Sequence, residues 1–107
     1  MRNVARRAAF CGLLSLVGVY AAPASEAASV VIDSIDFSPA AVTVHVGESV
    51  TWINRDIVDH TVTALSGDFD MPTPQGRSAR WRAAKVGEFA YFCRLHPNMT
   101  GVIRVTR

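Results

Sequence analysis

The stretch YFCRLHPNM, residues 91–99, decides how the rest of the chain is interpreted. It places a thiol, an imidazole and a thioether at Cys93, His96 and Met99, with three residues from each donor to the next. Sulfur and imidazole together favour copper over magnesium or calcium, and a trigonal copper site takes two His, one Cys and a weakly bound axial Met. Because the stretch supplies three of these four donors, a second His is expected from elsewhere, and His60 is the candidate.

Each of these side chains also has a simpler explanation, which the residues themselves leave open. A lone Cys is often a small buried apolar residue, and Met often fills a gap in a core. Zinc binds the same donors, although structural zinc sites usually bring Cys-x-x-Cys pairs, which this sequence lacks. We interpret His45, which alternates outward between two valines, as a surface residue, and Met71 as a surface or packing residue.

The N-terminal segment has the composition of a secretory signal peptide. Three arginines precede an apolar run over residues 8–22, which is short for a membrane span, and small residues follow it. We predict a signal peptide over residues 1–24, cleaved after Ala24 or Ala27, and a periplasmic mature protein without a membrane span. An uncleaved anchor is the alternative, and Arg6-Arg7 leaves twin-arginine export open beside the general route.

Removing the leader changes both the charge and the cysteine count. The whole chain has a net charge of +2, but three of its 11 basic residues lie in the leader, which leaves a nearly neutral domain. Nothing in that balance favours nucleic acid as a partner. Cys11 would be lost, so Cys93 would be a single cysteine in an oxidising compartment, where it indicates a partner chain, a reactive thiol or a metal. The neighbouring His96 favours a metal.

The rest of the chain, residues 25–107, is predicted to be one all-β domain. Apolar and polar residues alternate in short segments separated by turn residues, without helical periodicity. The expected strands lie near residues 30–37, 42–46, 50–54, 61–65, 78–83, 89–93 and 101–106. The segment 66–76, rich in Gly, Pro and Asp, is expected to be irregular. Seven to eight strands at this spacing predict a Greek-key β-sandwich or barrel.

Two blocks of the sequence resemble the type 1 blue copper proteins, the cupredoxins. The first is VHVGESVTWINR at residues 44–55, leading to His60, and the second is GEFAYFCRLHPNMTG at residues 87–101. The short Cys-x-x-His-x-x-Met spacing is similar to that of the amicyanin group within this family. The similarity extends over nearly the whole mature chain and implies a cupredoxin-like fold.

The resemblance implies one type 1 copper ion per chain. His60, Cys93 and His96 would be its equatorial ligands and Met99 its axial ligand. It also implies that Asn54 braces the loop that carries Cys93.

The same resemblance implies that the chain carries single electrons between redox proteins, such as a dehydrogenase donor and a c-type cytochrome acceptor. His96 would reach the surface inside an apolar patch with Leu95, Pro97 and Ile57. We expect a monomer that is not itself an enzyme, because no nucleophile–base pair or pair of carboxylates is evident. A copper-binding or copper-delivery protein without a role in electron transfer is the alternative.

Three residues depart from the family's pattern. Leu95 stands where these loops usually have Pro, and it keeps a backbone N–H that could bond the Cys93 sulfur. Arg94 stands where a small hydroxyl residue is usual and adds a charge beside the expected docking surface. Asp59 replaces the residue expected before His60.

Overall fold

The structure is a computed structural model that describes residues 26–107, and the predicted signal peptide lies outside this range. Within it the chain forms nine strands and no helix, so the predicted all-β class is confirmed and the strand number exceeds the expected seven to eight. No helix long and apolar enough to cross a membrane occurs among these residues. The strands are β1 (Glu26–Asp33), β2 (Asp36–Ser38), β3 (Ala41–His45), β4 (Ser49–Asn54), β5 (His60–Ala64), β6 (Asp70–Thr73), β7 (Ser78–Arg82), β8 (Gly87–Phe92) and β9 (Thr100–Thr106).

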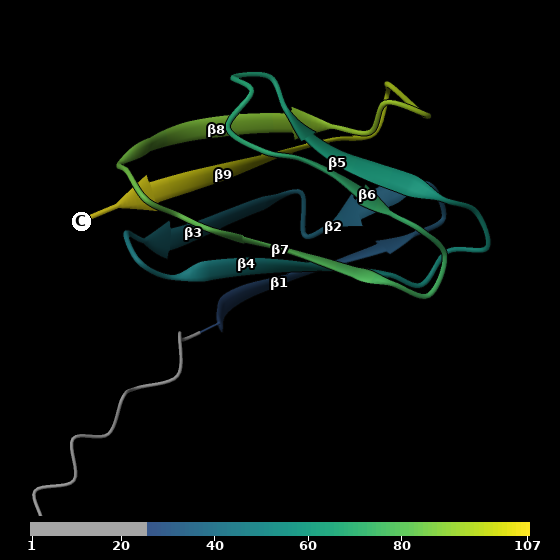
Figure 1. Cartoon of the computed structure of the whole chain (residues 1–107), viewed down its shortest axis with the longest axis horizontal. Helices are drawn as coiled ribbons and strands as arrows, with labels where there is room; N and C mark the ends of the chain where they lie inside the picture. Colours follow the sequence, from purple (N-terminus) through teal and green to yellow (C-terminus); the bar gives the residue numbers. More distant parts are fainter. Residues whose placement is uncertain (1–25) are drawn as a thin grey trace, which may run out of the picture.

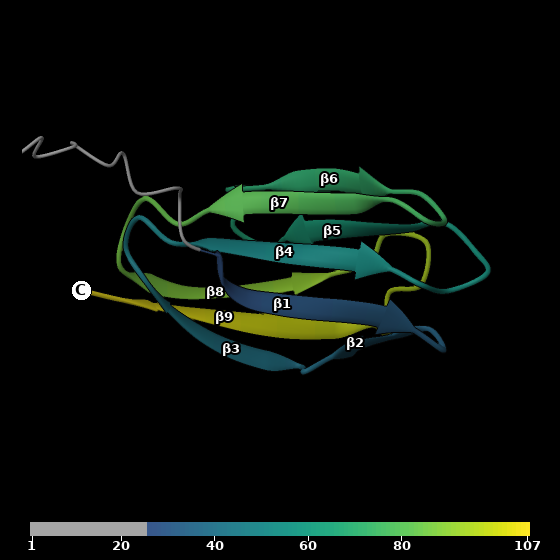
Figure 2. The same ribbon diagram turned by 90° about the horizontal axis from the view of Figure 1, so that it is seen from below.

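Two sheets stack face to face to form a β-sandwich (Figure 1). One sheet has the strand order β2-β1-β4-β7 and the other has the order β3-β9-β8-β5-β6. Figure 2 looks onto the first sheet, with β1 and β4 in front of β9 and β8. The pairs β1/β4 and β3/β9 are parallel, and the remaining pairs are antiparallel.

The centre of the core comes from β4 and β8. Val50 and Trp52 of β4 face Phe89 and Tyr91 of β8 across the sandwich, as the predicted alternation requires, and all four are buried. The rings of Trp52 and Tyr91 meet edge to face with centroids 5.4 Å apart. The same alternation continues past the end of β8 to Cys93, which is fully buried. A strand built to fill the core therefore delivers the thiol to one end of it.

The single strand expected over residues 30–37 is wrong, because the chain reverses within it. Ser34 and Ile35 have φ values of 53° and 54°, so β1 and β2 form a hairpin in which Val31 pairs with Ser38. Positive φ at both central residues is typical of a type I′ turn, which usually carries Asn-Gly. The Ser-Ile pair at this turn lacks the Asn-Gly pattern from which such a turn is usually predicted. Ile35 is held there by Asp56, whose Oδ2 accepts its N–H at 2.8 Å.

The segment expected to be irregular contains the short strand β6. It pairs antiparallel with β5, so that Thr73 lies opposite His60 and Pro72 opposite Thr61. β6 is the edge strand of its sheet, so it has no second neighbouring strand. Pro72, which has no backbone N–H to donate, is tolerated at such an edge. Met71, predicted to be a surface or packing residue, is partly buried against the core.

The loops of the sandwich gather at its two ends. The β4–β5 and β8–β9 connections lie together at one end, and Figure 2 shows them at the right. The C-terminus and the start of β1 lie at the opposite end. We call the first end the ligand pole, because both stretches singled out in the sequence reach it.

Candidate metal centre

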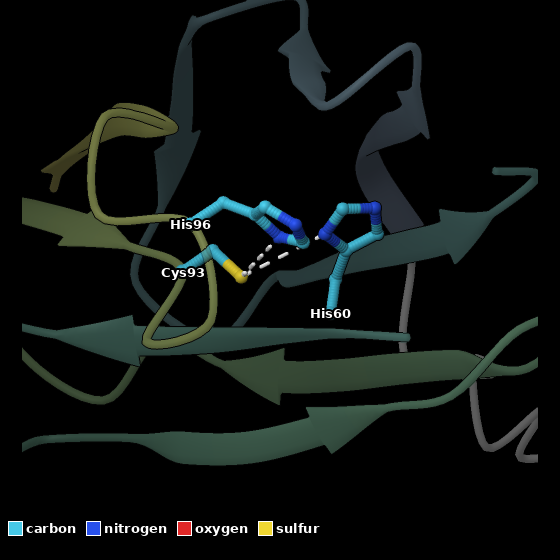
Figure 3. A group of neighbouring side chains, drawn as sticks. All are labelled: His60, Cys93 and His96. Carbon is cyan, nitrogen blue, oxygen red and sulfur yellow. Dashed lines mark hydrogen bonds between the residues drawn. The ribbon is translucent and has the colours of Figure 1, made fainter. Parts of the chain in front are cut away.

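Three predicted donors converge at the ligand pole. Figure 3 shows the rings of His60 and His96 on the same side of the Cys93 sulfur. The sulfur lies 3.7 Å from Nδ1 of His60 and 3.9 Å from Nδ1 of His96. One donor atom from each residue lies within 4.8 Å of the others. The structure therefore brings together residues that are 33 and three positions apart in the sequence.

These separations can be tested against a bound metal. A first-row metal binds thiolate sulfur at about 2.3 Å and imidazole nitrogen at about 2.0 Å. A trigonal angle of about 120° between those bonds then places sulfur and nitrogen about 3.7 Å apart, whereas a tetrahedral angle gives about 3.5 Å. The separations of 3.7 and 3.9 Å are close to both values, so one metal ion could contact the sulfur and both nitrogens after small side-chain shifts. The preference for copper therefore rests on the donor types, two His and one Cys, and not on these distances.

Strand pairing positions His60 against Cys93. His60 is the first residue of β5, and Cys93 directly follows β8. The two strands pair antiparallel with Thr63 opposite Phe92, so the start of one lies beside the end of the other. Both side chains are buried, with exposed fractions of 1% and 0%. The nitrogen and sulfur donors therefore sit on sheet ends that packing already holds in place.

The loop from Cys93 to Met99 closes on itself. The Cys93 N–H donates to the Met99 carbonyl at 3.2 Å, and the Met99 N–H donates to the His96 carbonyl at 2.9 Å. Pro97 disfavours helical geometry at His96, so the turn does not continue as a helix. Met99 is buried, whereas His96 is half-buried. This short loop thus carries the second imidazole to the surface and keeps the thioether inside.

Asp56, which was not among the predicted site residues, fixes the orientation of the His60 ring. Its Oδ2 lies 2.8 Å from Nε2 of His60, which leaves Nδ1 facing the sulfur. The carboxylate also accepts the N–H groups of Ile35 and Ile57. The bonds from Ile35, from His60 and from Ile57, in that order, lower the pKa of Asp56. A carboxylate hydrogen-bonded to the nitrogen that does not bind the metal is a common way to orient a metal-binding His. The sequence pattern that could have indicated this role is an acidic residue four positions before His60.

Hydrogen bonds to the Cys93 sulfur favour its thiolate form. Burial raises the pKa of the Cys93 thiol, but the Thr61 N–H, both imidazoles and the Leu95 N–H outweigh it and lower the pKa to about 6. The Thr61 N–H lies 3.4 Å from the sulfur. The Leu95 N–H, which a Pro at this position would lack, is the last of the groups that lower this pKa. The thiolate, which is the form that binds a metal, is therefore accessible near neutral pH.

The predicted role of Asn54 is wrong. Its amide donates to the carbonyls of Val58 and Thr73 at 2.9 and 2.8 Å, and its oxygen accepts the Asp56 N–H at 2.8 Å. Asn54 therefore braces the loop before His60 against β6. The Cys93 loop is instead held by the Thr61 hydroxyl, which accepts the N–H of the residue after Cys93 at 2.8 Å. Both roles depend on tertiary contacts that residue spacing does not reveal.

Two other residues considered from the sequence lie outside the centre. His45 is exposed, and its Nδ1 lies 3.0 Å from the Arg107 carbonyl at the far end of the sandwich, so its interpretation as a surface residue is confirmed. Asp59, next to His60 in sequence, accepts the N–H of Gln75 at 2.9 Å. It therefore supports a neighbouring turn rather than the sulfur or the imidazoles.

An apolar pocket opens beside the half-buried imidazole. It is lined by Ile35, Leu95, His96, Pro97, Asn98 and Met99. Leu95 and Ile35 expose about half of their surface, at 58% and 49%, and Ile57 in the adjacent loop exposes 81%. The expected apolar surroundings of His96 thus include Ile35, which was predicted to lie inside a continuous strand.

Comparison with known proteins identifies the family. The model of the cupredoxin-like domain matches residues 7–105. The chain belongs to the cupredoxin family. Its donor set of His60, Cys93, His96 and Met99 fits a single type 1 copper site, in agreement with the predicted cofactor. No curated protein sequence matched the chain.

Several solved cupredoxin structures are similar to this one. A purple cupredoxin from Nitrosopumilus maritimus is 26% identical with a TM-score of 0.67, and the match covers 74% of this chain and 99% of the other. Amicyanin from Paracoccus versutus is 26% identical with a TM-score of 0.66, covering 78% and 83% of the two chains. A copper-containing nitrite reductase from Thermus scotoductus SA-01 is 28% identical with a TM-score of 0.66; the match covers 75% of this chain but only 22% of the enzyme. The chain therefore resembles amicyanin over most of both lengths, and one domain of a larger enzyme.

Proposed function

We propose that this chain is a periplasmic mononuclear copper protein that carries single electrons between redox proteins. His60 Nδ1, Cys93 Sγ and His96 Nδ1 would hold the metal, and Met99 would be a fourth, weaker ligand. Bound copper supplies one-electron exchange between Cu(II) and Cu(I). Residues 1–24 would direct export, with cleavage after Ala24 or Ala27, and the mature domain would act as a monomer rather than as an enzyme.

The observation that carries this proposal is a buried thiol between two imidazole nitrogens, only one of which reaches the surface. Cys93, His60 and Met99 have exposed fractions of 2% or less, so little room remains for a substrate next to the metal. Paired strands and the Asp56 carboxylate hold these donors. A site whose donors move little between two oxidation states has a small barrier to electron exchange.

The half-buried His96 supports a route for the electron. Its ring lies between the sulfur and the apolar pocket that opens to solvent. A redox protein that covers Leu95 and Ile35 would approach the metal through this one ring. A dehydrogenase donor and a c-type cytochrome acceptor fit the resemblance to the amicyanin group.

The first test is the visible spectrum of the mature domain loaded with Cu(II), before and after ascorbate. We expect an intense blue or purple thiolate-to-copper band that bleaches and returns on reoxidation. Cys93→Ser should abolish the band, whereas His45→Asn, the matched histidine control at the far end, should keep it. A colourless or pale metal-bound protein would reject the proposal and favour copper delivery or a structural zinc site.

The alternative function is copper delivery without electron transfer, because an exposed imidazole also gives a copper acceptor access to the metal. The rate at which the protein loses Cu(I) to a strong chelator distinguishes copper delivery from electron transfer. An electron carrier should release copper over hours, and its rate of electron self-exchange should be far higher than its rate of copper loss. Release within seconds would support delivery instead.

A further inference from the structure

A closed circuit of hydrogen bonds joins the Cys93 loop to β5 and β6 without using any copper ligand. The Arg94 N–H donates to the Thr61 hydroxyl at 2.8 Å, and that hydroxyl lies 3.0 Å from the hydroxyl of Thr63. The Thr63 hydroxyl donates to Oδ1 of Asp70 at 2.9 Å. The circuit closes where the Arg94 guanidinium pairs with Oδ2 of the same carboxylate.

The carboxylate sets the direction in which the two hydroxyl groups of the circuit donate. An ionised carboxylate can only accept, so the Thr63 hydroxyl must donate its proton to Asp70. The Thr61 hydroxyl must then donate to Thr63, which leaves a lone pair of Thr61 for the Arg94 N–H. Bonds that point the same way along a chain strengthen one another in a partly buried site. Asp70 therefore controls an N–H next to Cys93 although it touches no donor atom of the metal centre.

Thr61 connects this circuit to the sulfur. Its side chain holds Arg94, the residue after Cys93, while its backbone N–H lies 3.4 Å from Sγ of Cys93. Thr61 also directly follows His60. Thr61 therefore holds β5 and the Cys93 loop together through two contacts, one from its backbone and one from its side chain.

The exposure of each side chain indicates which hydrogen bond contributes most to the circuit. The side chains of Arg94 and Asp70 are 58% and 46% exposed, and an exposed ion pair by itself contributes little. Thr63 is only 6% exposed, so its hydroxyl has little access to water as a substitute partner. The loss of the Thr63 hydroxyl should therefore loosen the circuit more than the loss of the surface charge pair.

We propose that Thr63 and Asp70 are positioning residues that hold the N–H···S bond of the copper site through Thr61 and Arg94. The redox consequence of this proposal rests on the proposed function, whereas its structural part does not. A bond from an N–H draws electron density from the sulfur and so favours the reduced metal. Loosening the circuit should accordingly make the site harder to reduce.

The structural part is tested on the metal-free protein by hydrogen exchange of the Arg94 amide. Thr63→Val should speed this exchange about tenfold through local opening. Thr106→Val is the matched control, because the Thr106 hydroxyl is also hydrogen-bonded but lies at the far end of the same sheet. Asp70→Asn should also speed exchange at Arg94, and Asp68→Asn, which breaks the ion pair with Lys85, should not.

The redox part is tested on the copper-loaded protein by its reduction potential. Thr63→Val should lower the equilibrium constant for reduction about threefold, or roughly 28 mV at ~59 mV per tenfold change. Thr106→Val should leave it unchanged. Since Val and Thr have the same charge, the shift cannot come from a change in net charge.

Unchanged exchange at Arg94 in both Thr63→Val and Asp70→Asn would overturn the proposal. So would a Thr63→Val potential equal to that of the wild type despite faster exchange, because the circuit would then not reach the sulfur. If the wild type instead binds copper without a thiolate-to-copper band, the proposed function fails, while the exchange measurement still decides the structural part.

Discussion

At the scale of single residues, Asp56 decides which nitrogen of His60 meets the sulfur. Its carboxylate holds Nε2 at 2.8 Å. Asp56→Asn removes the anion and one accepting oxygen, so the ring loses its fixed orientation. We expect copper affinity to fall by about 10- to 100-fold, as is usual when such a partner is lost. A Cu(I) titration against a competing chelator measures this. Asp59→Asn, in the same loop, should bind as the wild type does; equal affinities in the two variants would contradict the assignment.

Cys93 gives the metal-free protein a dependence of stability on pH. Burial raises the pKa of its thiol, but hydrogen bonds outweigh burial and lower the pKa from 9.0 to about 6, so the folded state binds fewer protons than the unfolded state between these values. The free energy of unfolding should therefore rise with pH from about 6 to about 9, and this contribution is lost as pH falls through 6. Urea denaturation at several pH values, with Cys93→Ala as reference, measures the difference. Parallel profiles for the two proteins would refute this prediction.

At the scale of elements, the β1–β2 turn contains a strained residue. Ile35 has a φ of 54°, which is unusual for a β-branched side chain, whereas Asn tolerates it. Ile35→Asn should therefore raise the free energy of unfolding by about 1 kcal/mol. The same change should slow electron exchange with a partner, because it removes an apolar residue from the pocket beside His96.

Chemical denaturation and stopped-flow electron transfer measure the two effects. Ile57→Asn is the control for stability, since Ile57 is 81% exposed and has no positive φ. A loss of stability in Ile35→Asn beyond that of the control would show that the turn is not strained.

The elements also show what can be predicted from this sequence. β4 and β8 were predicted because their residues alternate between core and solvent. β6 and the β1–β2 turn were not, because Pro72 and a Ser-Ile pair at positive φ do not follow the usual patterns. The convergence of Cys93 and His96 was predictable because one short loop carries both. Asp56 and Thr61 were missed because their roles depend on how separate strands pack.

At the scale of the whole molecule, metal binding should contribute a large share of stability. A domain of about 80 residues buries roughly 60–65% of its unfolded surface and is marginally stable alone. A metal in 100-fold excess over its dissociation constant adds about 2.7 kcal/mol. Thermal unfolding with and without Cu(I) should therefore show a clear rise in Tm, and Cys93→Ser should show almost none. An equal rise in both proteins would place the stabilising metal elsewhere.

The position of the two ends of the domain has a consequence for how it can be connected. The start of β1 and the C-terminus lie opposite the ligand pole. A linker, a partner domain or a surface tether joined at either end would therefore leave the copper face uncovered. In the nitrite reductase from Thermus scotoductus SA-01, the similar region is about a fifth of a longer polypeptide. A domain attached to an enzyme or an electrode through either end would therefore keep the face beside His96 turned toward solvent.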